Sequence, residues 1–173
     1  IRAGPYEVVP MVTYPHAFWT VTGETVERTE PSGAEDVHLM VTVRDPETGA
    51  VIPAETGLEL TVGREGESGS THVPWPMVSQ EMGLHAGDNV PLGEDGTYEV
   101  VVRVGSVDAR LTGDYAGRFD ESGTGTFTFT FDDAFRSEVI EGIVYVDEAD
   151  RGRRGALANA MALMGSEGTE ENA

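Results

Sequence analysis

The sequence contains no cysteine, no lysine and no long apolar run. Without cysteine the chain has no disulfide framework, no thiolate zinc site and no cysteine nucleophile, although this absence leaves the cellular compartment open. No stretch approaches the roughly 20 apolar residues that a membrane-spanning helix needs. A stable fold must therefore come from a hydrophobic core. A chain of 173 residues, 39% of them hydrophobic, has enough material for one.

Positive charge is scarce as well. The 11 basic residues are all arginine, against 31 Asp and Glu, and the formal net charge is −20. No basic patch is present to neutralise phosphates, which argues against DNA or RNA as a partner. The acidic residues run through the whole chain, so we interpret them as a solvated surface. Because molar salt shortens the Debye length to about 3 Å and screens such repulsion, this surface predicts a halophilic protein.

The chain opens with Ile1-Arg2-Ala3-Gly4, without Met and without the pattern of a signal peptide. We expect a mature or trimmed chain that has lost a targeting segment or anchor. Residues 1–146 are expected to form one domain. Residues 147–173 are expected to form a charged linker, a short helix at 156–164 and a disordered tail.

Short runs of alternating hydrophobic residues, separated by clusters rich in Gly, Pro, Ser or acidic residues, dominate the first 146 residues. Tyr98, Val100 and Val102, for example, fall on one side of a strand that places Glu99 and Arg103 on the other. Such runs are typical of a sandwich or barrel. We predict an all-β antiparallel sandwich of about seven strands, at residues 6–13, 18–22, 36–44, 58–64, 97–104, 125–131 and 143–146.

The run at residues 36–44 carries potential metal ligands on its non-core face. Val37, Leu39, Val41 and Val43 make the core face, so His38 and Met40 must point the other way. Two residues span about 7 Å along a strand, a separation from which both side chains can reach one ion. The alternative is that the methionine simply fills a gap in the packing.

A second segment, residues 75–89, concentrates the same chemistry. Two methionines, a glutamate and a histidine fall within residues 77–85, in what we interpret as a loop punctuated by Pro and Gly. Imidazole, thioether and carboxylate groups together are ligands for copper or iron.

Residues 75–89 resemble the Met-Pro-Met-Val…Gly…His…Gly…Asn signature of the periplasmic iron-transport accessory proteins, the Fe(2+) transport family. Val37-His38-Leu39 is similar to that family's strand containing His-Leu-Glu. Gly117-Arg118-Phe119 is similar to its Gly-Arg-His stretch, and residues 127–131 to its closing aromatic strand. The resemblance spans roughly residues 36–131, and residues 77–89 are its most specific part.

The resemblance implies an immunoglobulin-like β-sandwich that binds copper and iron beside a high-affinity iron permease. It implies an extracytoplasmic homodimer with each metal site near the subunit contact. Position by position, His38, Met77 and His85 match the family's metal-site His, Met and His. Glu81 falls where the family has an Asp and is expected to supply an oxygen ligand.

The chain also departs from the family's pattern. Met40 stands where the family has a Glu, Phe119 stands where it has a third His, and one extra residue separates Met77 from His85. These changes make the site softer, so we predict one copper ion rather than iron, with Met40 and Glu81 as neighbours or additional ligands. Zinc is expected to be able to occupy the imidazoles in a crystal.

The remaining histidines, His16 and His72, are each expected to be exposed loop residues without ligand chemistry beside them. His16 would be the recruit if Phe119 has vacated a coordination position.

Two alternatives to metal binding compete at the level of sequence. The first is catalysis, but the sequence has no nucleophile elbow, phosphate loop or His-Glu-x-x-His pattern, so we predict binding instead. The second is a purely structural immunoglobulin-like module of the cell envelope, which the fold alone would allow.

Overall fold

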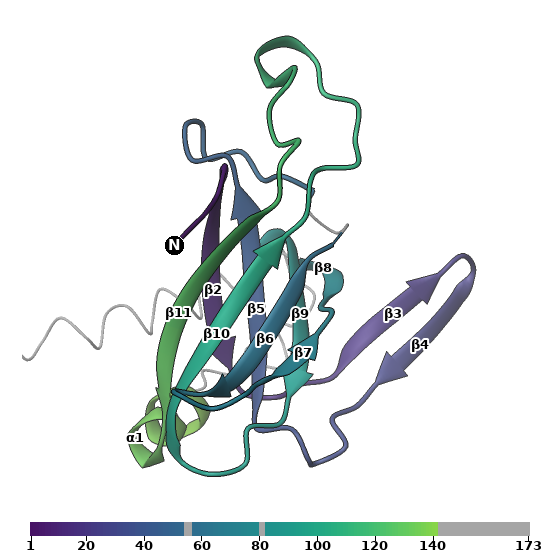
Figure 1. Ribbon diagram of the computed structural model, residues 1–173. Coiled ribbons are helices and arrows are strands. Elements are labelled where there is room, and N and C mark those ends of the chain that lie inside the picture. The colour runs from purple at the N-terminus through teal and green to yellow at the C-terminus, as the bar shows by residue number, and fades with distance from the viewer. Residues whose placement is uncertain (54–56, 80–81, 142–173) are drawn as a thin grey trace, which may run out of the picture.

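Two antiparallel sheets and a projecting two-stranded arm make up the computed structural model, which describes residues 1–53, 57–79 and 82–141 (Figure 1). One sheet has the order β1 (Arg2–Ala3), β2 (Tyr6–Thr13), β5 (Val37–Arg44), β9 (Gly83–Val90), β8 (Trp75–Ser79). The other has the order β11 (Gly123–Phe131), β10 (Gly96–Val104), β6 (Glu59–Arg64), β7 (Ser70–His72). The predicted all-β antiparallel sandwich is confirmed.

The core lies between the two sheets and follows the alternation seen in the sequence. Tyr98, Val100 and Val102 are buried, whereas Glu99 and Arg103 on the same strand are exposed. They face the apolar side of β5, and Leu60 from the neighbouring strand β6 lies beside them in the same core. Both faces of β5 are buried, however, so its second face is not the wet surface that alternation alone suggests.

The arm consists of β3 (Phe18–Thr22) and β4 (Thr25–Thr29) and projects away from the sandwich (Figure 1). Its two-residue turn places Gly23 at a φ of 60°, a left-handed conformation that glycine adopts without steric cost. Trp19, Val21 and Val26 are all more than half exposed on it. A two-stranded ribbon with so little burial has little stability of its own.

The described residues form eleven strands rather than about seven, and one correction concerns the candidate site. Residues 77–85, interpreted as a loop, belong largely to a hairpin of β8 and β9, in which Met77 pairs with His85. Short β1 and β7 and the second arm strand β4 were also not foreseen.

The chain after β11 turns into a short helical segment, α1 (Asp133–Phe135) and η2 (Arg136–Glu141). The strand expected at 143–146, the domain boundary at 146, and the linker, helix and tail expected at 147–173 lie outside the described residues. Among the described residues, no helix has the length and apolar character needed to cross a membrane.

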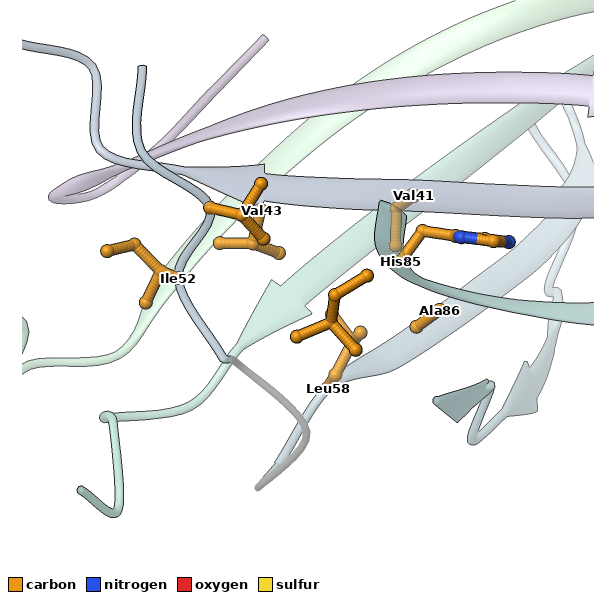
Figure 2. Close-up of a pocket in the computed structure, with 8 residues that line it drawn as sticks. Val41, Val43, Ile52, Leu58, His85 and Ala86 are labelled. Carbon is orange, nitrogen blue, oxygen red and sulfur yellow. The ribbon is translucent and has the colours of Figure 1, made fainter. Parts of the chain in front are cut away.

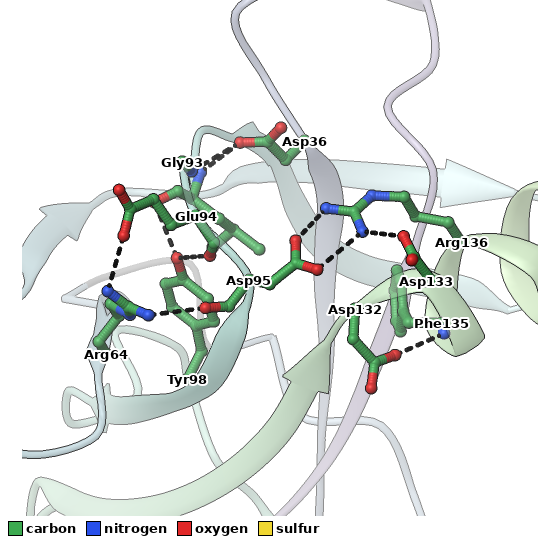
Figure 3. Close-up of polar contacts among 11 residues, drawn as sticks. Asp36, Arg64, Gly93, Glu94, Asp95, Tyr98, Asp132, Asp133, Phe135 and Arg136 are labelled. Atoms are coloured by element: carbon green, nitrogen blue, oxygen red, sulfur yellow. Dashed lines mark hydrogen bonds and ion pairs between the residues drawn. The ribbon is translucent and has the colours of Figure 1, made fainter.

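A polar network fixes this helical segment against the β9–β10 turn (Figure 3). Arg136 donates to Asp95 and, at 3.1 Å, to Asp133. The hydroxyl of Tyr98 donates to carbonyl oxygens of the same turn, and the carboxylate of Asp36 accepts from two of its backbone N–H groups. The polar groups of this network find their hydrogen-bond partners within it, so we assign the network a structural role.

A second polar network lies at the end of the sandwich where the β10–β11 connection runs. The hydroxyl of Tyr6 lies 2.9–3.3 Å from three carbonyl oxygens of the β10–β11 connection. Arg118 donates to the buried carboxylate of Asp45 at 2.7 Å and lies 4.7 Å from the ring centroid of Phe119. Hydrogen bonds from Thr48, the Glu47 backbone and Arg118 lower the pKa of Asp45 to about 2. We call Tyr6, Asp45, Arg118 and Phe119 the closed end.

Candidate metal centre

Strand register brings four of the five predicted ligands to one face of the five-stranded sheet. His38 pairs with Asn89, Met40 with Gly87, and Met77 with His85. Directly opposed residues in an antiparallel pair point to the same side, and residues two apart on a strand share a face. His38, Met40, Met77 and His85 therefore lie on the same face. Glu81, the fifth, lies outside the described residues.

His38 occupies the buried end of this face. Its side chain is fully buried, and its Nδ1 lies 2.8 Å from Oδ1 of Asn89. Burial lowers the pKa of His38 to about 4, helped by the nearby His16 and His85 and opposed by the Asn89 hydrogen bond. The imidazole is therefore neutral at physiological pH, the form that binds metals.

The Nε2 atom of His38 has no hydrogen-bond partner. Among the described residues it shares this property with one other buried side-chain polar atom, Nε of Arg44. A Cβ placed at Gly87 would lie 2.9 Å from both Nε2 of His38 and Cγ of Met40, so these side chains meet over the glycine. The close approach explains why position 87 carries no side chain.

His85 and Met77 border an open groove with a volume of about 600 Å³ between the arm and β8. His85 is 7% exposed, and its Nδ1 lies 3.0 Å from the carbonyl oxygen of Gly83. Met77 is half-buried. The two side chains thus stand where an ion entering from solvent can reach them.

A small apolar cavity of about 20 Å³ lies on the other side of His85 (Figure 2). The imidazole points away from Ile52 and Leu58, which line this cavity with other aliphatic side chains. Such a lining offers no polar partners for a bound water, so the cavity serves as apolar backing for the histidine.

His16 belongs to this cluster, although from the sequence it was expected only as a recruit in place of Phe119. Its ring centroid lies 4.1 Å from that of His38, and it lines the groove together with His85 and Met77. The expectation of an exposed loop histidine without ligand chemistry beside it is therefore wrong. The backbone of His16 is held by Asn89, whose Nδ2 donates to the His16 carbonyl at 3.0 Å.

The sequence also led to expectations about His72 and Phe119. His72 lies at the end of β7 in the opposite sheet, half-buried, with Nε2 2.9 Å from the hydroxyl of Ser70. Phe119 is buried at the closed end, stacked on Tyr6 at 5.4 Å. Tyr6 and His38 stand at opposite ends of the β2–β5 pair. The idea that Phe119 vacated a place near His38 is therefore wrong for a site within one chain.

The donors on this face suit a soft metal ion. Within residues 1–53, 57–79 and 82–141, no three His, Asp or Glu side chains already converge closely enough to hold an ion. The face instead combines imidazoles with the thioethers of Met40 and Met77. Nitrogen and thioether sulfur together favour copper over the oxygen-preferring ions. Of these donors, Met77 and His85 border the open groove, where rotation of their side chains can bring them closer to an ion.

Several solved structures share this fold. No protein-family model and no curated protein matches the sequence. Among solved structures, a copper-bound variant of FetP from uropathogenic Escherichia coli strain F11 is similar, with a TM-score of 0.59, 18% identity and coverage of 76% of this chain and 92% of that one. As-isolated FetP from the same strain gives a TM-score of 0.58 and 20% identity, covering 76% and 91%.

Copper-reconstituted P19 from Campylobacter jejuni is also similar, with a TM-score of 0.56, 16% identity and coverage of 76% of this chain and 91% of that one. The chain therefore shares the fold of these proteins over most of their length. This confirms, at the level of the fold, the resemblance to the iron-transport accessory proteins.

Proposed function

We propose that this chain is an extracytoplasmic copper-binding protein that assists high-affinity iron uptake. The observation that carries the proposal is the fully buried, neutral His38, whose Nε2 has no partner, on the same sheet face as His85 and Met77. An unsatisfied buried polar atom costs about 1–3 kcal/mol. A ligand that binds there removes this cost, so the arrangement suits a metal site.

Copper is the ion that the donors favour. His38, His85 and Met77 are the proposed ligands, with Met40 and Glu81 as neighbours or additional ligands. Thioethers select Cu(I), and imidazoles accept either oxidation state, whereas iron favours more oxygen donors than this face offers. Zinc would compete for the imidazoles only. FetP and P19, which share the fold, have been solved with copper bound.

The biological setting follows the family resemblance. We infer a location outside the cytoplasm, an iron permease as partner and a homodimer with each metal site near the subunit contact. We also infer that the chain binds rather than catalyses. The exposed arm beside the groove supports a contact surface near the site, because it carries Trp19, Val21 and Val26 into solvent.

Titration of metal-free protein with Cu(I), Cu(II), Fe(II) and Zn(II) tests the proposal. We expect one copper ion per chain and a preference for copper over Fe(II). The variants His38→Ala, Met77→Ala and His85→Ala should each bind copper more weakly, while the matched control His72→Ala should bind it like the parent.

Equal copper affinity in the three site variants and the parent would place the site elsewhere. A preference for Fe(II) would contradict the argument from soft ligands. Protein that ignores copper, iron and zinc at stoichiometric concentration would instead support the structural-module alternative.

A further inference from the structure

Three histidines of this region share one hydrogen-bonding pattern. In His16, His38 and His85, the Nδ1 atom lies 3.1, 2.8 and 3.0 Å from an oxygen of Ala17, Asn89 and Gly83, respectively. Carbonyl and carboxamide oxygens only accept hydrogen bonds, so each Nδ1 carries the proton. In the neutral form of each ring the lone pair then lies on Nε2. Holding Nδ1–H on an oxygen while Nε2 binds the ion is the usual arrangement of metal-ligating histidines.

The fourth histidine lacks this pattern. His72 directs Nε2, not Nδ1, toward the Ser70 hydroxyl, and it lies on the opposite sheet. Nδ1 contacts to oxygen acceptors are therefore found in the three clustered histidines and not in the isolated one. This contrast gives His16 a role beyond packing on His38.

The position of His16 also fits a ligand. His38 is fully buried, and the ring that contacts it at 4.1 Å belongs to His16, which lines the groove. Asn89 holds both residues, since Oδ1 faces Nδ1 of His38 and the His16 N–H at 3.4 Å, while Nδ2 donates to the His16 carbonyl. One amide thus positions both histidines.

We propose that His16 is a third imidazole ligand of the metal site, in addition to His38 and His85. This inference rests on the proposed copper-binding function. A consequence for the oxidation state follows from the chemistry. A third nitrogen donor supports Cu(II), while the thioether of Met77 supports Cu(I), so removal of His16 should weaken Cu(II) binding more than Cu(I) binding.

Pulsed electron paramagnetic resonance of the Cu(II)-loaded protein counts the coordinated imidazoles directly. We expect three in the parent, two in His16→Gln and three in the matched control His72→Gln. Competition titrations should show about a 10- to 100-fold loss of Cu(II) affinity in His16→Gln. The loss of Cu(I) affinity should be smaller.

A count of two imidazoles in the parent would overturn the role of His16 while leaving copper binding intact. So would a His16→Gln variant with the parent's count and Cu(II) affinity. Failure of the parent to bind copper would overturn the proposed function itself, and the role of His16 with it. The parent's imidazole count decides the question even if His16→Gln and the second variant His16→Asn fail to fold.

Discussion

The two ends of the sandwich both bury polar side chains, but they treat them differently. At the closed end the Tyr6 hydroxyl reaches three carbonyl oxygens, and the Asp45 carboxylate receives hydrogen bonds from Arg118, Thr48 and the backbone. At the metal-site end, His38 is equally buried but satisfies only one of its two ring nitrogens. We interpret this difference as one between a stabilising network and the proposed binding site; the unsatisfied nitrogen alone is not the criterion, since buried Nε of Arg44, next to Asp45, also lacks a partner.

Physical chemistry assigns a different consequence to each arrangement. Satisfied buried groups contribute to stability, and removal of one member exposes the others to the full cost of desolvation. An unsatisfied group lowers stability until a ligand binds. The closed end should therefore be sensitive to mutation with or without metal, whereas the metal-site end should be tolerant in the metal-free protein.

The largest expected effect comes from truncation at the closed end. Tyr6→Ala removes a fully buried aromatic side chain together with its hydroxyl donor, so we expect a loss of about 3–5 kcal/mol in the free energy of unfolding. His38→Leu replaces an incompletely bonded imidazole with an apolar side chain, and we expect a change of about 1 kcal/mol or less, of either sign. Denaturant unfolding of the metal-free proteins measures both.

For copper affinity we expect the reverse order, with the larger effect from substitution at the metal-site end. His38→Leu should abolish it, and Tyr6→Phe, a milder change at the closed end, should leave the affinity unchanged. If His38→Leu destabilises the metal-free protein as much as Tyr6→Ala does, the distinction between the two ends is wrong.

As the pH falls, the two ends should lose their contributions to stability in different pH ranges. The pKa of His38 is lowered to about 4 in the folded protein, so between pH 6.5 and 4 the unfolded chain binds a proton that the folded chain does not. Stability therefore falls as the pH drops through this range, by about 2 kcal/mol once screening by the adjacent groove is allowed for.

The closed end responds at lower pH. The pKa of Asp45 is lowered to about 2, so its contribution is present above pH 3.8 and is lost as the pH falls toward 2. Unfolding of metal-free parent, His38→Leu and Asp45→Asn across pH 2–7 tests both windows. The parent and His38→Leu should differ in slope between pH 6.5 and 4, and identical slopes there would contradict the assignment.

Asn89 should affect affinity more than stability. Its amide orients His38 and holds the backbone of His16, so Asn89→Ala should weaken copper binding about 10- to 100-fold. Asn89→Asp keeps an acceptor for Nδ1 of His38 but cannot donate to the His16 carbonyl, and should fall between the parent and Asn89→Ala. Equal affinity in all three proteins would show that Asn89 does not position the ligands.

Salt should change the stability of the molecule as a whole. It should have the smallest effect on the difference between the closed end and the metal-site end. If the net charge of −20 reflects adaptation to a salt-rich setting, the melting temperature should rise between ~0.1 M and ~2 M NaCl. A recovery of about 1 kcal/mol corresponds to a rise of about 3 °C for a chain of this size. An unchanged melting temperature would count against the halophilic interpretation.

Alternation was enough to predict the sandwich and part of the site. It placed the apolar residues of β5 and β10 in the core and put His38 and Met40 together on the other face of β5. These features depend on the two-residue period of a single strand, which the sequence displays directly. The β8–β9 hairpin was missed because Pro76, Gly83 and Gly87 are typical of loops.

Contacts between distant segments could not be predicted in the same way. His16 meets His38 because the chain passes over the sheet before entering the arm, and no local pattern signals that path. Phe119 shows the converse case: a short motif likeness aligned it with a histidine of the family, and within one chain the structure buries it at the closed end, away from His38. Residue type and spacing indicate which groups can bind, but long-range topology decides which of them meet.

The groove beside the site has an optical consequence. The chain has two tryptophans, and both Trp19 on the arm and Trp75 on β8 line this groove. Because Met77 and His85 line the same groove, Cu(II) bound there should quench the indole fluorescence of both tryptophans. Intrinsic emission should thus follow Cu(II) loading without an added dye. Trp19→Phe and Trp75→Phe would show whether the arm or the sheet contributes the signal.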